Sequence, residues 1–557
     1  MNLHAVYHLL GQVLLLLALF LLVPACVALF YGEHGAWSAC LRSSAISGAL
    51  GMGLVHMITR QVGEQSEYGP ERRSLGTRRN LALLGFSLTC ALVIGFLPWG
   101  SHADLLDLAG TLPSLGEFSA AHLLLAGQIA VLLFALSVLV HQLRHDRKRA
   151  ELNQKEFYRR EGLAVVGLSW LIAGIIGAFP FLFSGAIPGV VDAFFESVSG
   201  FTTTGSTILS AEGIDGMAKS ISFWRSFTHW LGGIGIVLVF VVLFPAGGRS
   251  LFRSEVPGVS REAVHQRVRD SGVSLMRIYV GLTVVQVALY MLADLPLYEA
   301  LVHAFGTLAT GGFSSHSESM AYFQSPLVEG ITIAFMFAAG INFAIYDTVL
   351  RSGPKRGWRM AVQSSEVRVY AGVMGGSILV IAAVLWFWGG SNGVAGSELP
   401  DYTRATSALR DSSFVVTSVQ TSTGFGTADF DQWPQFARML LMGLAFIGAC
   451  AGSTGGGLKV VRFMILAKAS LRSFQQFARP RAKLLVRMNG EPLGEDMVSG
   501  IVGYFGMWFL IFGSATLGLT AMDIDPLTAM TGVLATLNNI GPGLDLVGPT
   551  QSFGWMP

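Results

Sequence analysis

Four short polar segments, each closing on glycine and each following an apolar run, limit the fold of this chain more than any other feature. They read GFTTTGST (200–207), LATGGFSSH (308–316), TSTGFG (421–426) and LNNIGPG (537–543). A proline precedes each segment, at Pro188, Pro296, Pro400 and Pro526, and the helical run between is too short to cross a membrane. The closing glycines, spaced 106, 113 and 117 residues apart, are Gly205, Gly311, Gly424 and Gly541. This spacing predicts an array of four units, each a helix, a re-entrant loop and a helix.

Composition places the array in a membrane. Of the 557 residues, 52% are hydrophobic and 13% are charged, and the mean hydropathy is +0.56. Soluble domains carry about 25% charged residues. A deficit of this size over this length predicts a polytopic membrane protein. The four cysteines lie in or beside apolar stretches at no metal-ligand spacing, so we expect them to pack rather than to bind zinc or pair.

The basic residues indicate the topology. Five clusters, at 60–79, 144–160, 249–277, 351–368 and 459–487, contain 31 of the 37 Lys and Arg residues. Positively charged loops stay cytoplasmic, so each stretch between clusters leaves the membrane and returns. Two hairpins come first, at 5–58 and 80–143, and long excursions follow at 160–248, 272–350 and 369–458, with a fourth beginning at 496. Two spans need about 40 residues, so each long excursion holds additional structure between its helices.

The residue types of the four segments suit a cation pathway. Non-helical backbone at membrane depth is tolerated only where protein or water surrounds it. Four loops that converge on one axis meet this condition, and their carbonyl oxygens can then replace the water around a monovalent cation. Glycine permits the positive φ that such a loop needs, and the short helices direct the negative ends of their dipoles at the axis. The alternative is that the four segments are ordinary turns between tilted helices. That interpretation does not explain why each segment follows a helix too short to cross the membrane.

The segments DAFFESVSGFTTTGST, ATGGFSSH, TSTGFGTADF, ATLNNIGPGLDLVG and GACAGSTGGGLKVVR resemble the Trk/Ktr/HKT superfamily of potassium transporters, most closely its TrkH membrane subunits. The resemblance covers about residues 1–58 and 160–557. It implies an all-α polytopic membrane protein with four pseudo-symmetric helix–pore loop–helix repeats around one ion pore, plus extra N-terminal transmembrane hairpins. The four loops are degenerate relatives of a potassium-channel filter. The filter residues it implies are Thr203, Thr204, Gly205, Ala309, Thr310, Gly311, Ser422, Thr423, Gly424, Asn539, Ile540 and Gly541.

A glycine-rich segment, FIGACAGSTGGGLK (446–459), lies where the second helix of the third repeat is expected. Glycine costs about 1 kcal/mol per site against alanine in a helix, so the cluster should break this helix and face the pore below the filter. The resemblance implies an intramembrane loop that blocks the pore and moves on activation, with gate residues Gly452, Ser453, Thr454, Gly455, Gly456, Gly457 and Lys459. A cytoplasmic turn is the alternative. A phosphate-binding P-loop is excluded because Leu458 separates the last glycine from Lys459.

The expected domains are an N-terminal transmembrane hairpin (1–59), an inserted transmembrane hairpin (60–158) and four pore repeats at 159–270, 271–360, 361–490 and 491–557. The inserted hairpin, with spans at about 80–98 and 120–141, departs from the usual TrkH pattern, and the sequence gives no physical account of its use. Only 16 residues follow Gly541. We therefore expect the fourth repeat to lack its closing helix.

Other ionisable residues near the loops are few. Asp192 and Glu196 lie in the first pore helix, where they could hold an ion at the outer mouth or accept backbone hydrogen bonds behind the filter. The second reading is favoured. His316 follows the second loop and is expected to be a solvated histidine. The sequence contains no catalytic pattern of Ser/His/Asp, zinc-binding or paired-carboxylate type, so we expect no enzymatic activity.

The predicted function is potassium uptake across the bacterial inner membrane, with K⁺ as the transported ion and no organic cofactor. The alternatives are a sodium-permeable or ion-coupled cation symporter, and a polytopic membrane sensor or enzyme that conducts no ion. The resemblance implies a homodimer and a cytosolic, TrkA-like nucleotide-binding ring as a partner. Membrane lipid surrounds the chain, and the basic clusters need no nucleic acid to explain them. The sequence leaves open the coupling ion, the regulating nucleotide and the K⁺ over Na⁺ selectivity.

Overall fold

The computed structural model describes residues 3–64, 159–243, 268–391, 402–479, 481 and 484–556. The spans predicted at 80–98 and 120–141, and Pro400, lie outside these described residues. The chain divides into two compact units. The first comprises Met1–Val198, Met217–Trp224 and Val239–Glu255, and the second comprises Ser199–Gly216, Arg225–Leu238 and Val256–Pro557. All four predicted loops belong to the second unit.

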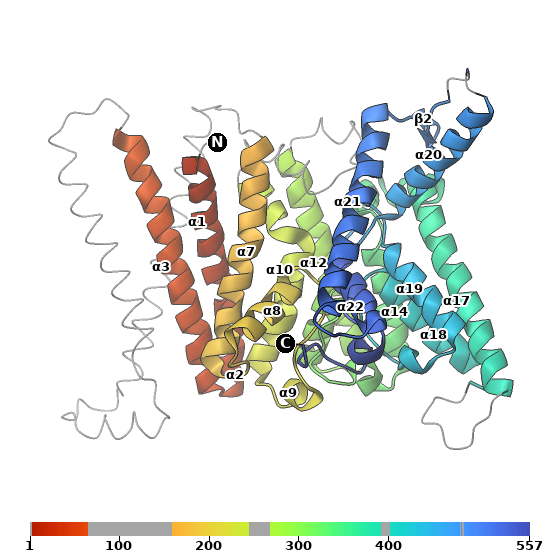
Figure 1. Cartoon of the computed structure of the whole chain (residues 1–557). Coiled ribbons are helices and arrows are strands. Elements are labelled where there is room, and N and C mark those ends of the chain that lie inside the picture. The colour runs from red at the N-terminus through yellow and green to blue at the C-terminus, as the bar shows by residue number, and fades with distance from the viewer. Residues whose placement is uncertain are drawn as a thin grey trace, which may run out of the picture. The chain divides into compact units, whose positions relative to one another are not determined.

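The first unit contains helices α1 (Leu3–Phe20), α2 (Leu22–Tyr31), α3 (His34–Glu64), α7 (Arg159–Ser184) and most of α8 (Val190–Phe201). Helices α1 and α3 lie side by side (Figure 1). Their close approach depends on small residues. The hydroxyls of Ser44 and Ser47 donate to the carbonyls of Ala18 and Leu14, at 2.6 and 2.7 Å. Short polar side chains that bond across helices are typical of packing within a membrane.

The second unit contains most of α10 (Lys219–Leu243) and the remaining elements. Its helices are α9 (Ala211–Asp215), α12 (Val268–Leu292), α13 (Leu297–Leu308), α14 (Pro326–Ala339), α15 (Phe343–Ser352), α16 (Pro354–Gln363), α17 (Ser365–Ser391), α18 (Ala405–Gln420), α19 (Gln435–Phe446), α20 (Val460–Ala478), α21 (Glu495–Thr520) and α22 (Pro526–Leu537). Short 3-10 turns lie at Ser319–Phe323, Phe430–Gln432 and Asp545–Val547. Strands β1 (Arg487–Met488) and β2 (Glu491–Pro492) form a two-stranded antiparallel hairpin, with Arg487 opposite Pro492.

Along the chain, a long helix and a short helix alternate in the order that the sequence predicts. The long helices α7, α12, α17 and α21 have 26, 25, 27 and 26 residues, and the short helices α8, α13, α18 and α22 have 12, 12, 16 and 12. Among the described residues, five helices are long and apolar enough to cross a membrane, or six if α14 and α15 form one broken span. The prediction of a helical, polytopic membrane protein is confirmed.

The helix that follows each of the first three loops is interrupted. Helix α10 has non-helical backbone at Gly235, with φ 75° and ψ 136°. Helices α14 and α15 meet at an angle of 91°. Helix α19 ends at Phe446 and α20 begins at Val460, with the glycine-rich segment between them. The sequence analysis predicted the third interruption and missed the first two, which depend on the single glycines Gly235 and Gly340 rather than on a cluster.

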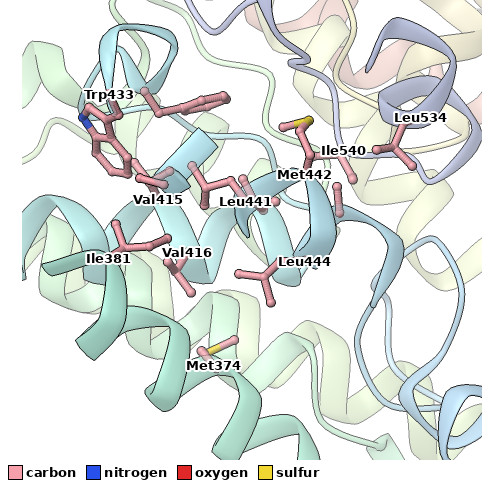
Figure 2. Packing of buried hydrophobic residues seen from close by; sticks show 14 of the residues in the cluster. Met374, Ile381, Val415, Val416, Trp433, Leu441, Met442, Leu444, Leu534 and Ile540 are labelled. Atoms are coloured by element: carbon pink, nitrogen blue, oxygen red, sulfur yellow. The ribbon is translucent and has the colours of Figure 1, made fainter. Parts of the chain in front are cut away.

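Buried apolar side chains hold the short helices in place. In one extended cluster, Met374 and Ile381 of α17 pack with Val415 and Val416 of α18 (Figure 2). The same cluster continues through α19 to Leu534 of α22 and to Ile540, which belongs to the fourth loop. Within a membrane, such contacts stabilise the packing of helices through van der Waals attraction rather than through transfer of apolar surface from water. The loops are therefore attached to packed helices.

Candidate functional site

The four predicted loops share one backbone conformation. In each, a residue in the left-handed region is followed by one residue of ordinary φ and then by a glycine of positive φ. The φ angles are 56° and 80° at Thr203 and Gly205, 54° and 83° at Thr310 and Gly312, 58° and 80° at Ser422 and Gly424, and 57° and 99° at Asn539 and Gly541. Only glycine adopts this region without steric cost, which explains the glycine at the third position.

The hydrogen bonds at the end of each short helix repeat in the same way. The amide of the left-handed residue donates to the carbonyl three residues earlier, as from Thr203 to Gly200, at 3.0 Å. The next amide donates five residues back, as from Thr204 to Ser199, at 2.9 Å. The other three loops make the same pair of bonds, from Thr310 and Gly311, from Ser422 and Thr423, and from Asn539 and Ile540. The four loops are therefore structurally equivalent, residue by residue.

This equivalence corrects the predicted register of the second loop. The alignment on Gly311 is wrong by one residue, because Gly312 has the positive φ and Gly311 does not. The equivalent residues are Thr310, Gly311 and Gly312, and Ala309 is only the C-cap of α13. The corrected glycines are 107, 112 and 117 residues apart. A sequence signal was present, since Gly312 and Gly424 are both followed by phenylalanine, at Phe313 and Phe425.

The four glycines form a closed ring. A β-carbon on Gly205 would meet the carbonyl of Gly311, one on Gly312 that of Thr423, and one on Gly424 that of Ile540. A β-carbon on Gly541 would lie 3.1 Å from the carbonyl oxygen of Thr204, which returns to the first loop. Each glycine thus abuts the carbonyl of the residue before the next glycine. Because the contacts run from the first loop through the fourth and back, the loops surround one axis in chain order.

Polar side chains join the last loop to the first. The Nδ2 atom of Asn539 donates to the carbonyl of Thr202 at 2.8 Å and to Oγ1 of Thr204 at 2.9 Å. The hydroxyl of Ser206 donates to the carbonyl of Gly541 at 3.1 Å. The two loops are separated by more than 330 residues in sequence. These bonds therefore close the ring at the only junction where the neighbouring loops are not consecutive in the chain.

His229 of helix α10 packs against the first and second loops of the ring. His229 is fully buried, and its Nδ1 lies 2.8 Å from the carbonyl of Gly200. Its ring lies against Phe313, with 4.1 Å between the ring centroids. A β-carbon on Gly311 would meet the His229 ring, so this position needs glycine for space although its φ is ordinary. The sequence analysis missed His229, which no local motif marks.

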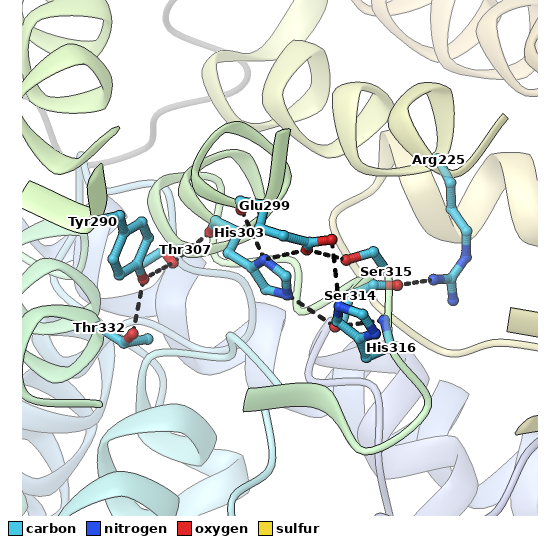
Figure 3. A network of polar contacts seen from close by, with 9 residues as sticks. All are labelled: Arg225, Tyr290, Glu299, His303, Thr307, Ser314, Ser315, His316 and Thr332. Atoms are coloured by element: carbon cyan, nitrogen blue, oxygen red, sulfur yellow. Dashed lines mark hydrogen bonds and ion pairs between the residues drawn. The ribbon is translucent and has the colours of Figure 1, made fainter. Parts of the chain in front are cut away.

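A polar network fixes the segment after the second loop (Figure 3). Ser314 is its centre. Nε2 of His303 lies 2.9 Å from the Ser314 hydroxyl, and Nη1 of Arg225 donates to the Ser314 carbonyl at 3.0 Å. The Glu299 carboxylate accepts from the Ser315 hydroxyl at 2.6 Å and lies 3.3 Å from Nε2 of His316.

His316 was expected to be solvated, and this prediction is wrong. Its side chain is 20% exposed. The ring stacks on Tyr322, with 3.5 Å between centroids, because the 3-10 turn at Ser319–Phe323 folds back over it. In the first pore helix, Glu196 is buried and Asp192 is exposed at the first turn of α8. That Glu196 accepts backbone hydrogen bonds behind the filter stays a prediction.

The glycine-rich segment folds as a compact loop between α19 and α20. The amide of Gly448 donates to the carbonyl of Leu458 at 2.8 Å, which brings the two ends of the loop together. Positive φ angles at Gly452 (72°) and Gly457 (65°) shape its turns. The hydroxyl of Ser453 donates to the Cys450 carbonyl at 2.6 Å, and the Lys459 ammonium donates to the Gly455 carbonyl. A contact from outside the loop is made by Glu366, whose carboxylate accepts from the amide of Ala451 at 2.6 Å.

The tip of this loop contacts the ring. The amide of Gly456 donates to the hydroxyl of Ser422, the left-handed residue of the third loop, at 2.6 Å. A β-carbon on Gly455 would lie 3.0 Å from the Thr421 carbonyl, and one on Gly456 would lie 2.6 Å from the Asn538 carbonyl. On its other side, Thr454 bonds the carbonyl of Ala339 at the end of α14. The loop thus contacts the end of α14, the third loop and Asn538, which directly precedes the fourth loop's left-handed residue.

The chemistry available at the ring is that of neutral oxygen. Among the described residues, no group of three or more His, Cys, Asp or Glu side chains could hold a metal ion. Each of the four loops directly follows the C-terminal end of a short helix, where the helix dipole supplies about −0.5 charge. Carbonyl oxygens and helix C-termini favour a monovalent cation and disfavour an anion. This arrangement can replace part of a cation's hydration shell without forming a fixed, high-charge site.

Comparison with known proteins agrees with this geometry. The family model described as "TrkH: Cation transport protein" matches residues 127–553. The TrkH potassium uptake protein of Salmonella typhimurium LT2 is 37% identical over 398 residues, which is 70% of this chain and 79% of the relative. The TrkH protein of Escherichia coli K12 is 36% identical over the same shares. The crystal structure of the potassium transporter TrkH from Vibrio parahaemolyticus matches all of this chain and 93% of its own, with a TM-score of 0.68 and 27% identity. The chain belongs to the TrkH family of cation transport proteins.

Proposed function

We propose that this chain is the membrane subunit of a potassium uptake system, in which K⁺ crosses the inner membrane through the ring of four loops. The closed ring of glycines and carbonyls is the observation that carries the proposal. Its relatives are named as potassium uptake proteins of the Trk system, which supports potassium as the substrate. Uptake proteins of this kind transport rather than catalyse, so we propose no enzymatic activity.

The proposed filter consists of Thr203, Thr204, Gly205, Thr310, Gly311, Gly312, Ser422, Thr423, Gly424, Asn539, Ile540 and Gly541. Their carbonyls take the place of water around K⁺, and the helix C-termini lower the cost of holding a positive charge there. The fourth loop differs from the others in its middle residue, because Ile540 has neither a hydroxyl nor the small size of glycine. We infer that the filter coordinates K⁺ asymmetrically, with fewer complete sites than a fourfold channel has.

The proposed gate is the glycine-rich loop, with Gly452, Ser453, Thr454, Gly455, Gly456, Gly457 and Lys459 as its residues. Two features support this role: Gly456 bonds Ser422 of the filter, and several glycines give the loop a backbone that can rearrange. A cation leaving the filter would meet this loop next. Opening therefore requires the tip of the loop to leave Ser422 and Asn538.

We also propose that the protein works as a homodimer and that a cytosolic, TrkA-like nucleotide-binding ring regulates it. The names of the relatives, which place them in a Trk system, support a multi-component assembly. Such a ring would dock on the side of the membrane that the basic segments predict to be cytoplasmic. Co-purification of the chain with that partner tests this part.

Growth complementation tests the function. The full-length gene is expressed in a bacterial strain that lacks its own potassium uptake systems, and growth is measured at low external potassium. Rescue is expected, together with uptake of ⁸⁶Rb⁺ that exceeds uptake of ²²Na⁺. A well-expressed protein that does not rescue growth rejects uptake. Equal or greater ²²Na⁺ flux instead favours the sodium-permeable or ion-coupled alternative, and no flux of either ion favours a sensor.

A further inference from the structure

Helix α16 has an exposed apolar strip beside an exposed basic strip. Trp358 and Val362, which lie four residues apart on one face, are 73% and 48% exposed. Lys355 and Arg359 share the adjacent face, and Arg356 flanks them. All three basic side chains are exposed, and the helix contains no acidic residue. A helix whose apolar strip does not pack on its own protein needs another partner for that strip.

Helix α16 packs on its two neighbours in the chain, α15 and α17. Gly357 is its one buried residue, and a β-carbon there would collide with Val349 of α15. The hydroxyl of Thr348 lies 3.4 Å from the sulfur of Met360. Helix α16 thus rests on α15 through Gly357 and Met360, which lie away from Trp358 and Val362. This packing fixes the helix while leaving its apolar strip uncovered.

The position of α16 in the chain sets its depth. Only Ser364 separates α16 from α17, whose residues Ser365–Trp388 are one of the candidate spans. On the other side, α15 is the second helix of the bent apolar pair α14–α15 and ends at Ser352, one residue before Gly353 with φ 87°. Ten helical residues extend about 15 Å, too short to cross a membrane. Because it is joined closely to two membrane segments, α16 lies at the boundary between the bilayer and water.

The positive charge of α16 indicates an anionic partner at the boundary between the bilayer and water. The helix belongs to the basic cluster at 351–368, which the positive-inside rule assigns to the cytoplasmic side. A short amphipathic helix with tryptophan on one face and Lys/Arg on the next is typical of helices that lie in the membrane interface. Each Lys or Arg near an anionic surface contributes about fivefold in affinity.

We propose that α16 is a binding site for anionic phospholipid of the cytoplasmic leaflet. Trp358 and Val362 enter the region between headgroups and acyl chains, and Lys355, Arg356 and Arg359 bind the phosphate groups. This inference concerns a surface in the second unit that is separate from the filter, and it does not depend on ion conduction. It predicts that the protein retains phosphatidylglycerol in preference to phosphatidylcholine.

The test uses brominated lipids, which quench tryptophan fluorescence on contact. Full-length protein in detergent is titrated with brominated phosphatidylglycerol or brominated phosphatidylcholine. The same titration of a Trp358→Phe variant is subtracted, which isolates Trp358 from the other ten tryptophans of the chain. The measured quantity is the mole fraction of lipid that gives half of the maximal quenching. We expect phosphatidylglycerol to reach this point at a mole fraction at least about tenfold below that of phosphatidylcholine.

A triple variant, Lys355→Gln, Arg356→Gln and Arg359→Gln, keeps the apolar strip and removes the charge. Its phosphatidylglycerol curve is expected to move to the phosphatidylcholine curve. The matched control removes three exposed basic residues elsewhere in the same unit, Arg479→Gln, Arg481→Gln and Arg487→Gln, and is expected to keep the preference. Each quenching curve is compared only between proteins that elute as single species in size-exclusion chromatography.

Three results would overturn the proposal. Equal quenching by the two lipids in the unmodified protein would show contact with acyl chains but no headgroup binding. If the control variant also lost the preference for phosphatidylglycerol, that preference would come from the total charge of the protein rather than from α16. An absence of quenching by both lipids would show that another surface covers Trp358. If Trp358→Gln then dissociated an oligomer, that surface would belong to a second copy of the chain. None of these readouts measures transport, so they are independent of the proposed function.

Discussion

The carbonyl oxygen of Thr204 lies 3.1 Å from the place that a β-carbon on Gly541 would take. These two residues belong to the first and last loops of the ring, and their contact closes it. Any side chain at Gly541 would push against this carbonyl, and the positive φ of 99° would be strained for any other residue. The ring therefore depends on packing between segments that are more than 300 residues apart.

The filter assignment predicts different effects for two glycines of the third loop. Gly424 has φ 80°, and a β-carbon there would meet the Ile540 carbonyl. Gly426, two residues later, has open space around the same position. We expect Gly424→Ser to lower the ratio of ⁸⁶Rb⁺ to ²²Na⁺ uptake by about tenfold, since a strained αL residue costs about 1–2 kcal/mol. Gly426→Ser is the control and should leave the ratio within twofold, a change of about 0.4 kcal/mol. Equal ratios in the two variants would contradict the assignment.

The corrected register predicts how the second loop responds to substitution. Gly312→Ala places a side chain on a residue of positive φ and against the Thr423 carbonyl, whereas Ala309→Gly changes only the C-cap of α13. We expect the first change to reduce growth rescue at low potassium strongly and the second to have little effect. Had Ala309 belonged to the filter, both changes would reduce growth rescue.

The side-chain hydrogen bonds of Asn539 join the last loop to the first, so their removal should lower the thermal stability of the protein. Asn539→Leu keeps most of the volume and removes the donor to Thr202 and Thr204. Loss of a hydrogen bond costs about 0.5–1.5 kcal/mol, so the thermal midpoint in detergent should fall. Thr536→Val removes a hydroxyl that bonds only within its own helix, to Gly532 at 2.9 Å and Val533 at 3.2 Å. The Thr536→Val variant should unfold near the midpoint of the unmodified protein. If its midpoint fell as much as that of Asn539→Leu, the loss of stability would come from α22 rather than from the junction between the loops.

If the glycine-rich loop is the gate, adding one methyl group at Gly456 should raise the resting ion flux. Gly456→Ala would bring a β-carbon within 2.6 Å of the Asn538 carbonyl, so the tip must move away from the filter. Resting ⁸⁶Rb⁺ flux into proteoliposomes without any partner is expected to rise about tenfold, which corresponds to about 1.4 kcal/mol against the closed state. Gly443→Ala, at an exposed position of α19 with no atom within 4 Å, is the matched control. Low flux in Gly456→Ala, equal to that of the control, would show that this loop is not the barrier.

A bidentate ion pair links α18 to α14 and predicts a non-additive mutant cycle. Arg410 of α18 donates from Nε and Nη2 to the carboxylate of Glu329 of α14, at 2.6 and 2.5 Å. The Glu329 side chain is 5% exposed. Arg410→Gln should lower stability by about 2 kcal/mol because it leaves a buried carboxylate without its cation. Adding Glu329→Gln should recover about half of this loss, as measured by thermal unfolding of the single and double variants. Strict additivity would mean that the pair contributes nothing.

The sequence by itself determined the membrane class, the four loops and the broken third helix, since each depends on local composition. Apolar runs can only be satisfied in lipid or a core, and glycine next to threonine marks backbone that is not helical. The choice between Gly311 and Gly312 rested on a weak signal, the phenylalanine that follows both Gly312 and Gly424, because either glycine could supply the positive φ. The sequence also left the single breaks at Gly235 and Gly340 unnoticed, since one glycine inside a helix is common.

Only the tertiary structure decided which residues meet. The contact of Gly541 with Thr204, the bond from Gly456 to Ser422 and the place of His229 behind Gly311 all join segments that are distant in the chain. Local patterns contain no information about such distances, because these contacts form only when helices pack at particular angles. The sequence therefore predicted which segments form the four loops. Only the packing of the helices around them determined that the loops meet in a closed ring.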